Sequence, residues 1–166
     1  TFAFTALTTN DLRGLNQSVT LSDGRALIMG GGNTSANVPS DLAELFLPVT
    51  NQFAAAAHGV SGERTFGGSA TVLQNGRQIL LSGGQADVRA GSKKLDAGPV
   101  LSSAEVYNMA TIRSAFAGNS MTVGRRFHTA TLLLDTSTTA ATKGSWHGKV
   151  LVTGGGGFLG RALVER

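Results

Sequence analysis

The sequence predicts an all-β protein built from a repeated, four-stranded antiparallel unit. A short apolar run followed by a glycine pair occurs three times, and such a run is typical of a strand that ends in a turn. The pairs are Gly30-Gly31, Gly83-Gly84 and Gly154-Gly155. The composition agrees, because 23 glycines and a charged fraction of 14% favour turns over helix.

Each of the first two copies begins with a strand, a turn and a second strand. Segments 18–29 and 69–82 are centred on Asp23-Gly24 and Asn75-Gly76, dipeptides that suit the positive φ of hairpin turns. A loop after the glycine pair leads to a third predicted strand and then to a weaker fourth one. In the two copies the third strand is expected at 42–46 and 103–107, and the fourth at 52–53 and 115–116.

Two loops absorb the difference in length between the copies. The first glycine of the pair recurs after 53 residues and then after 71 residues. Eight of the 18 extra residues fall in the loop Gln85 to Ser102, and the other ten fall near 135–147. Because consecutive antiparallel strands run in opposite directions, we expect these two loops on opposite faces of the fold.

The chain resembles the kelch repeat in its bacterial, galactose-oxidase-like form. The resemblance rests on an arginine before the first strand, the DG-type turn, the Gly-Gly ending and the Ala-Glu-apolar-aromatic pattern at 43–46 and 104–107. It implies a β-propeller of four-stranded blades with a period of about 50 residues. The fourth strand departs from the family pattern, because its aromatic residue is Phe53 or Phe116 instead of Trp.

On this resemblance the chain forms a single incomplete propeller, a partial β-propeller spanning residues 1–166. Residues 1–15 provide an outer lead-in strand at Phe2 to Leu7, 16–66 form blade I, 67–126 form blade II and 127–166 form a partial blade III. Propellers close a ring of typically 4 to 8 blades. We therefore expect further blades from missing sequence, from another chain or from copies of this chain. The related bacterial repeats imply an extracellular, periplasmic or cell-surface location.

Segment 150–163 supports a different interpretation. Its sequence TGGGGFLG is similar to the dinucleotide-binding loop of extended short-chain dehydrogenases, in which glycines let a strand turn toward a phosphate-binding helix N-terminus. Such a site needs a βαβ unit of roughly 30 residues and a later acidic residue. Six residues follow Gly160 in this sequence. An NAD(P)-binding segment is therefore the minor alternative.

The sequence favours no metal, cofactor or catalytic site. His58, His128 and His147 show no close ligand spacing such as HxH, and His128 occupies a repeat position at the start of a predicted strand. Glu44 and Glu105 are the same position of the repeat in neighbouring blades. We predict structural roles for both glutamates and for the glycine pairs.

The galactose-oxidase-like resemblance adds an enzymatic alternative. Copper-radical oxidation in that family uses a Tyr–Cys cross-link, a second Tyr and two His. This chain has no cysteine and a single tyrosine, Tyr107, at the aromatic position of the third strand. A carbohydrate or alcohol oxidase of this kind would need active residues outside the chain.

The predicted function is a non-catalytic scaffold or recognition module that binds a protein or glycan partner through its rim loops. The candidate partner-binding residues belong to the two long loops: Arg89, Lys93, Lys94, Lys143, Trp146 and His147. Nucleic acid is not favoured, because the net charge of +4 is scattered along the chain instead of clustered among aromatic residues. No apolar run approaches the roughly 20 residues that cross a bilayer.

Overall fold

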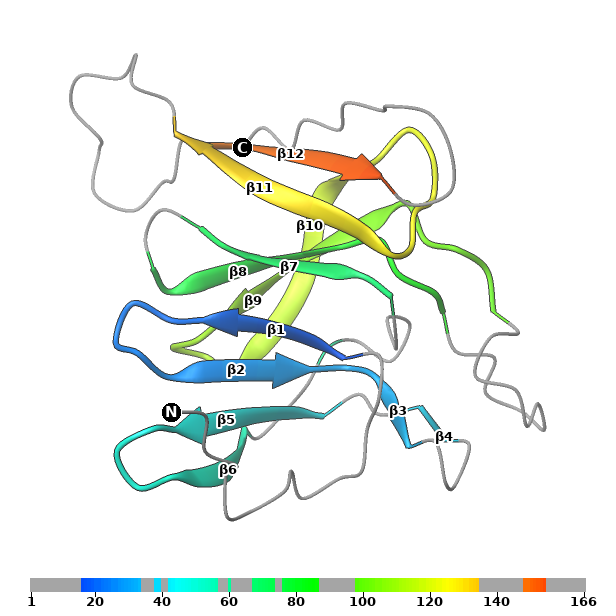
Figure 1. The fold of residues 1–166 in the computed structure, drawn as a ribbon. Coiled ribbons are helices and arrows are strands. Elements are labelled where there is room, and N and C mark those ends of the chain that lie inside the picture. The colour runs from blue at the N-terminus through cyan, green and yellow to red at the C-terminus, as the bar shows by residue number, and fades with distance from the viewer. Residues whose placement is uncertain are drawn as a thin grey trace.

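The computed structural model describes residues 16–33, 38–39, 42–56, 60, 67–73, 76–86, 98–134 and 148–154. All regular elements among these residues are β-strands, which confirms the predicted all-β class. Figure 1 shows two four-stranded antiparallel sheets and a hairpin in successive layers. The strand expected at Phe2 to Leu7 lies outside the described residues.

The strands form two meanders and two hairpins. Sheet I consists, in order, of β1 (Gln17–Thr20), β2 (Ala26–Met29), β5 (Ala43–Leu47) and β6 (Gln52–Ala56). Sheet II consists of β7 (Ser69–Val72), β8 (Gln78–Ser82), β9 (Ser103–Asn108) and β10 (Arg113–Ser120). Hairpin III consists of β11 (His128–Leu134) and β12 (Gly148–Gly154), and a short hairpin of β3 (Gly32–Asn33) and β4 (Val38–Pro39) lies between β2 and β5.

Sheets I and II share one register. In sheet I, Ile28 lies opposite Glu44. In sheet II, Leu81 lies opposite Glu105. Ile28 and Leu81 each stand two residues before the repeated glycine pair, so the two sheets are built from equivalent positions. The four-stranded antiparallel unit predicted from the repeat is therefore present in both.

The β1–β2 turn is fixed by backbone and side-chain hydrogen bonds. The Leu21 amide donates to the Arg25 carbonyl at 2.7 Å, and Gly24 has a φ of 85° that favours glycine. The Asp23 carboxylate accepts hydrogen bonds from Arg25 Nε at 2.8 Å and from the Arg25 amide at 3.1 Å. These two bonds, the side-chain one foremost, lower the pKa of Asp23 from its ordinary value of 3.8. The predicted Asp-Gly turn is thus confirmed.

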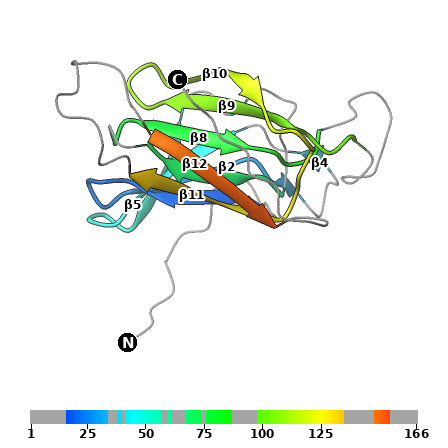
Figure 2. The same cartoon turned by 90° about the horizontal axis from the view of Figure 1, so that it is seen from above.

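The first strands of the three layers lie next to one another. In Figure 1, β7 lies between β1 and β11, and the residue contacts of β7 with both strands agree. Seen from above in Figure 2, hairpin III lies across the strands of the layers below it. Sheet II is therefore the middle layer, covered on one face by sheet I and on the other by hairpin III.

Two separate apolar cores fill the spaces between the layers. The core between sheets I and II consists of Leu21, Leu27, Met29, Ala43, Val60, Ile79, Leu81 and Tyr107. The core between sheet II and hairpin III consists of Leu73, Leu80, Ala104, Val106, Ala117, Met121, Val150 and Val152. Because side chains alternate along a strand, β8 sends Ile79 and Leu81 into the first core and Leu80 into the second.

The structure also contains features that the sequence pattern did not predict. The β3–β4 hairpin lies within the segment expected to be a plain loop. Strand β10 extends over eight residues, and its pairing with β9 is interrupted between Phe116 and Ser120. Gly118 lies within this irregular stretch and has a φ of 86°. The interrupted pairing and the positive φ of Gly118 mark a β-bulge in β10, an edge strand, and such a bulge bends the strand and re-aims its side chains.

Candidate functional site

Strands β2, β8 and β12 finish at the same end of the layers, which we call the glycine end. Gly30, Gly83 and Gly154 stand there with φ values of 64°, 59° and 84°. A Cβ atom on Gly83 would overlap the carbonyl oxygen of Arg125 and lie 2.5 Å from His128 Cε1. The missing side chain therefore lets the β10–β11 connection pass directly over the end of β8.

A buried polar cluster joins sheet II to hairpin III at the glycine end. His128 Nε2, at the start of β11, lies 3.0 Å from Ser69 Oγ and 3.2 Å from Ser82 Oγ. The two hydroxyl oxygens lie 2.8 Å apart. Ser82 is 1% exposed and His128 is 6% exposed. We call Ser69, Ser82 and His128 the polar seam.

The polar seam is built for cohesion instead of chemistry. A hydroxyl and an imidazole at hydrogen-bonding distance are the parts of a nucleophile and its base. Here, however, both hydroxyls lie in the layer between sheet II and hairpin III, where a substrate cannot reach Ser82 or His128. A further hydrogen bond from Thr71 Oγ1 to the Ala130 carbonyl, at 3.3 Å, crosses the same boundary. Together these bonds give partners to the buried hydroxyl groups and to His128 Nε2. Burying these groups without partners would destabilise the protein.

Arg125 lies next to the polar seam and contacts Gly84 and Gly154. Its side chain is buried, and Nη1 donates a hydrogen bond to the Gly154 carbonyl at 2.9 Å. Its own carbonyl accepts a hydrogen bond from the Gly84 amide at 2.7 Å. One residue thereby connects the ends of β8 and β12. The arginine that precedes the first strand of the third copy is thus a packing residue in this structure.

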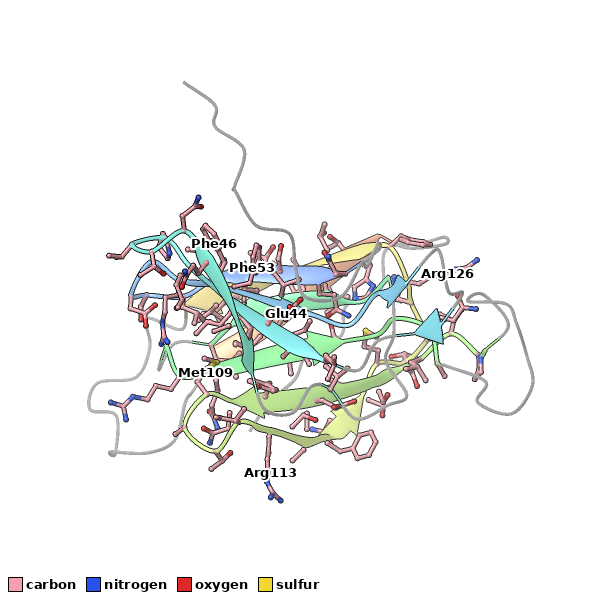
Figure 3. All side chains as sticks on the ribbon, turned by 90° about the horizontal axis from the view of Figure 1, so that it is seen from below. Glu44, Phe46, Phe53, Met109, Arg113 and Arg126 are labelled. Atoms are coloured by element: carbon pink, nitrogen blue, oxygen red, sulfur yellow. The ribbon has the colours of Figure 1, made fainter. Side chains whose placement is uncertain are left out.

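A more exposed surface lies on the next two residues. The Arg126 guanidinium carbon stands 5.5 Å from the centroid of the Phe127 ring, a cation–π arrangement. Arg126 Nη1 also donates a hydrogen bond to Gln85 Oε1, and Gln85 Nε2 donates to the Gly98 carbonyl at 2.7 Å. We call Arg126 and Phe127, together with the buried Gln85 that supports them, the Arg–Phe platform. Figure 3 shows Arg126 at the end of the molecule opposite Phe46, Phe53 and Met109.

Phe127 adopts an unusual backbone conformation while it remains exposed. Its φ is 53°, in the left-handed region that side chains rarely adopt, and its side chain is 59% exposed. The Phe127 amide donates to the Gly67 carbonyl at 2.6 Å, and a Cβ on Gly67 would lie 3.3 Å from the ring. Exposed Val100 and Val123 belong to the same cluster of connections. Strained residues of this kind gather at binding sites.

Some of the site residues predicted from the sequence lie in the described part of the chain, and others do not. Glu44 and Glu105 are buried at equivalent positions, and Figure 3 shows Glu44 among the strands. Tyr107 is buried in the core between sheets I and II, and burial raises its pKa above the ordinary value of 10.0. The remaining predicted residues lie outside the described part of the chain, namely His58, Arg89, Lys93, Lys94, Lys143, Trp146, His147 and Gly155.

The polar seam and the Arg–Phe platform were not singled out from the sequence. The sequence pattern predicts that the segment Arg125 to His128 starts the third copy and that His128 has a structural role instead of a metal-binding one. The sequence contains no spacing that points to the seam, because Ser69, Ser82 and His128 come together only where sheet II packs against hairpin III. The platform has no such signal either, since it depends on the φ of Phe127.

Metal ligands and membrane-spanning helices can be assessed over the part of the chain that the structure covers. Among those residues, no group of three or more His, Cys, Asp or Glu side chains is arranged to hold a metal ion. The same stretches contain no helix that is both long and apolar enough to cross a membrane.

Comparison with known proteins adds no support to the kelch resemblance. No protein-family model matches the chain, and no curated protein matches it.

Proposed function

We propose that this protein is a non-catalytic recognition module of the kelch β-propeller type. In this proposal sheets I and II are blades and hairpin III is part of a third one. Connections at the two ends of the blades contact a protein or glycan partner. Further blades come from other sequence, another chain or copies of this chain, in a secreted or surface assembly.

The arrangement of the layers supports the propeller part of the proposal. Strands β1, β7 and β11 lie next to one another, and each begins the repeated unit of its layer. Neighbouring blades of a propeller meet in this way around a central axis, with each sheet packed face to face on the next. The two separate cores and the shared register of sheets I and II fit the same plan.

The Arg–Phe platform is the observation that carries the recognition part. It combines an exposed aromatic ring with a half-buried guanidinium stacked on that ring, and the buried Gln85 side chain holds the guanidinium in place. Aromatic and arginine side chains are the residues that most often dominate binding energy. A rigid scaffold that presents such residues on its connections is the usual design of a recognition module.

Phe127→Ala tests the platform. The probes are a microarray of neutral and acidic glycans and, for protein partners, quantitative cross-linking with mass spectrometry. We expect Phe127→Ala to weaken binding about tenfold or more, because an aromatic anchor contributes about 2 kcal/mol. Phe116→Ala is the matched control, since Phe116 is 58% exposed on β10, away from the platform. Equal binding by both variants would exclude the platform as the contact surface.

The segment 135–147, which follows β11 and precedes β12 in the chain, gives a second, independent test. If this loop also binds a partner, Trp146→Ala and deletion of 135–147 reduce binding while the unfolding temperature stays that of the wild type. Unchanged binding in both variants would reject the loop as a contact site and leave the platform as the candidate.

A further inference from the structure

The outward face of hairpin III repeats a face that sheet II uses for packing. In sheet II, the hydroxyls of Ser69 and Ser82 lie 2.8 Å apart and both contact His128. In hairpin III, the hydroxyls of Thr129 and Thr153 lie 3.0 Å apart. The pairs are equivalent, because Ser69 lies opposite Ser82 and Thr129 lies opposite Thr153 in the strand registers.

Three further positions of the two faces match. Each first strand continues with a threonine two residues after the hydroxyl pair and a leucine two residues later, and each second strand has a leucine opposite that threonine. Side chains two residues apart lie on the same face of a strand. The residues are Thr71, Leu73 and Leu80 in sheet II, and Thr131, Leu133 and Leu151 in hairpin III.

The two faces differ in what covers them. Leu73 and Leu80 are each 1% exposed in the core beneath hairpin III. Leu133 is 39% exposed, and Thr129 and Thr131 are exposed as well. Hairpin III therefore carries an uncovered version of a surface that buries an apolar core elsewhere in this molecule.

Hairpin III covers sheet II with its inward face. The strand registers show which residues of sheet I are equivalent to that face. Gln17 lies opposite Met29, the residue before the first glycine pair. Thr129 lies opposite Thr153, the residue before the third pair. Gln17 and Thr129 are therefore equivalent positions of the repeat.

The residues before and after Gln17 and Thr129 are equivalent in the same way. Asn16 corresponds to His128, and Ser18 corresponds to Ala130. Asn16 and Ser18 are exposed, as is Thr20 further along β1. An asparagine amide can hydrogen-bond to a pair of hydroxyls, because its nitrogen donates and its oxygen accepts. In the polar seam a single nitrogen, His128 Nε2, faces both hydroxyls. The β1 side of sheet I is thus an open counterpart of the surface with which hairpin III covers sheet II.

We propose that the outward face of hairpin III binds a second copy of this chain through the β1 side of that copy's sheet I. The inference rests on the proposed repeat architecture. Asn16 of the second copy then contacts the Thr129–Thr153 hydroxyl pair in the place that His128 takes inside one chain. Thr131 donates to the Ser18 carbonyl of the second copy, as Thr71 donates to the Ala130 carbonyl.

This contact joins two different faces, so each copy keeps one free face of each kind. Such a head-to-tail contact builds rings or open chains instead of a symmetric dimer. A symmetric contact of hairpin III with hairpin III would bring two hydroxyl pairs together and lack the Asn16 amide. The two arrangements therefore respond differently to substitutions on sheet I.

The first experiment measures mass by light scattering during size exclusion over a range of concentrations. We expect wild-type protein to exceed the chain mass of 17.0 kDa, with a mass that rises with concentration. Leu133→Arg blocks one face and Ser18→Arg blocks the other, so each variant should elute at 17.0 kDa. Val49→Arg is the control, because Val49 is exposed in the β5–β6 turn, outside both faces.

Mixing the two blocked variants is the decisive step. Each has one intact face, and the intact faces are complementary, so the mixture should form a 1:1 dimer that neither variant forms alone. Circular dichroism checks that both variants keep their strands. If Leu133→Arg does not fold, Thr131→Arg at an exposed position of the same face takes its place.

Three outcomes would overturn the proposal. They are a wild-type protein that stays at 17.0 kDa up to millimolar concentration, a mixture that stays monomeric, and assembly that survives Ser18→Arg. None of these substitutions changes Phe127, and the glycan and cross-linking assays of Phe127→Ala measure binding to another molecule instead of the mass of the assembly. Failure of self-association and failure of the recognition function are therefore distinguished.

Discussion

At the scale of single residues, Gly83 shows why the repeat ends in glycine. Its φ of 59° disfavours any side chain, and the space beside it is occupied by the Arg125 carbonyl and the His128 ring. Gly24 has a similar φ of 85°, but a Cβ atom on this residue would have no neighbouring atom within 4 Å. A side chain at Gly24 would therefore cause backbone strain alone, whereas a side chain at Gly83 would cause backbone strain and steric overlap.

Gly83→Ala should destabilise the protein more than Gly24→Ala. Left-handed backbone costs about 1 to 2 kcal/mol for a residue with a Cβ, and this should be the whole effect at Gly24. At Gly83 overpacking adds about 1 to 3 kcal/mol. Urea unfolding of both variants measures the difference. Equal losses would mean that the Arg125 and His128 contacts do not constrain the end of β8.

Tyr107 should make stability fall at alkaline pH. Burial raises its pKa above the 10.0 of an exposed tyrosine, so the unfolded chain loses this proton at a lower pH than the folded protein does. The contribution is therefore present below about pH 10 and is lost as the pH rises through the folded-state pKa. Tyr107 is the only tyrosine in the chain, so ultraviolet absorbance follows its ionisation directly.

Tyr107→Phe supplies the comparison for this titration. The difference in unfolding free energy between the variant and the wild type should change above pH 10 and stay constant below it. Lysine and arginine titration affects both proteins alike and cancels in this difference. A phenolate midpoint at or below 10 in the folded protein would contradict the buried position of Tyr107.

At the scale of elements, strands with a clear apolar pattern could be predicted and the others could not. The runs at β2, β8 and β12 alternate or cluster apolar residues before a glycine, and these strands form where expected. β10 was expected only around Ala115 and Phe116, because Ser114 and the stretch after Ala117 are small or polar. Pairing with β9 extends this strand, and such a tertiary contribution has no local sequence signal.

The candidate site was predictable in part for a similar reason. The repeat positions of Glu44, Glu105 and the glycines follow from spacing along the chain, and spacing is visible in a sequence. The contact of His128 with two serines joins strands of different layers, 59 and 46 residues apart. The stack of Arg126 on Phe127 depends on a backbone angle. Neither the His128 contact nor the Arg126–Phe127 stack has a periodic pattern in the sequence from which it could be predicted.

At the scale of the whole molecule, stability should resemble that of a stack in which each layer contacts only its neighbours. Sheet II is the one described layer with an apolar core on each face. In repeat architectures of this kind, stability is approximately a sum of layer and interface contributions. Opening one interface should therefore loosen the outer layer on that side and leave the opposite outer layer in place.

Leu80→Ala and Leu81→Ala test this layering with adjacent residues of β8. Leu80 points into the core with hairpin III and Leu81 into the core with sheet I, and both are almost fully buried. Each truncation should cost about 2 to 5 kcal/mol. Hydrogen exchange should then accelerate in β11 and β12 for Leu80→Ala, but in β1 and β2 for Leu81→Ala. Acceleration of the same strands in both variants would show that the layers open as one unit, and the neighbour-by-neighbour description would be wrong.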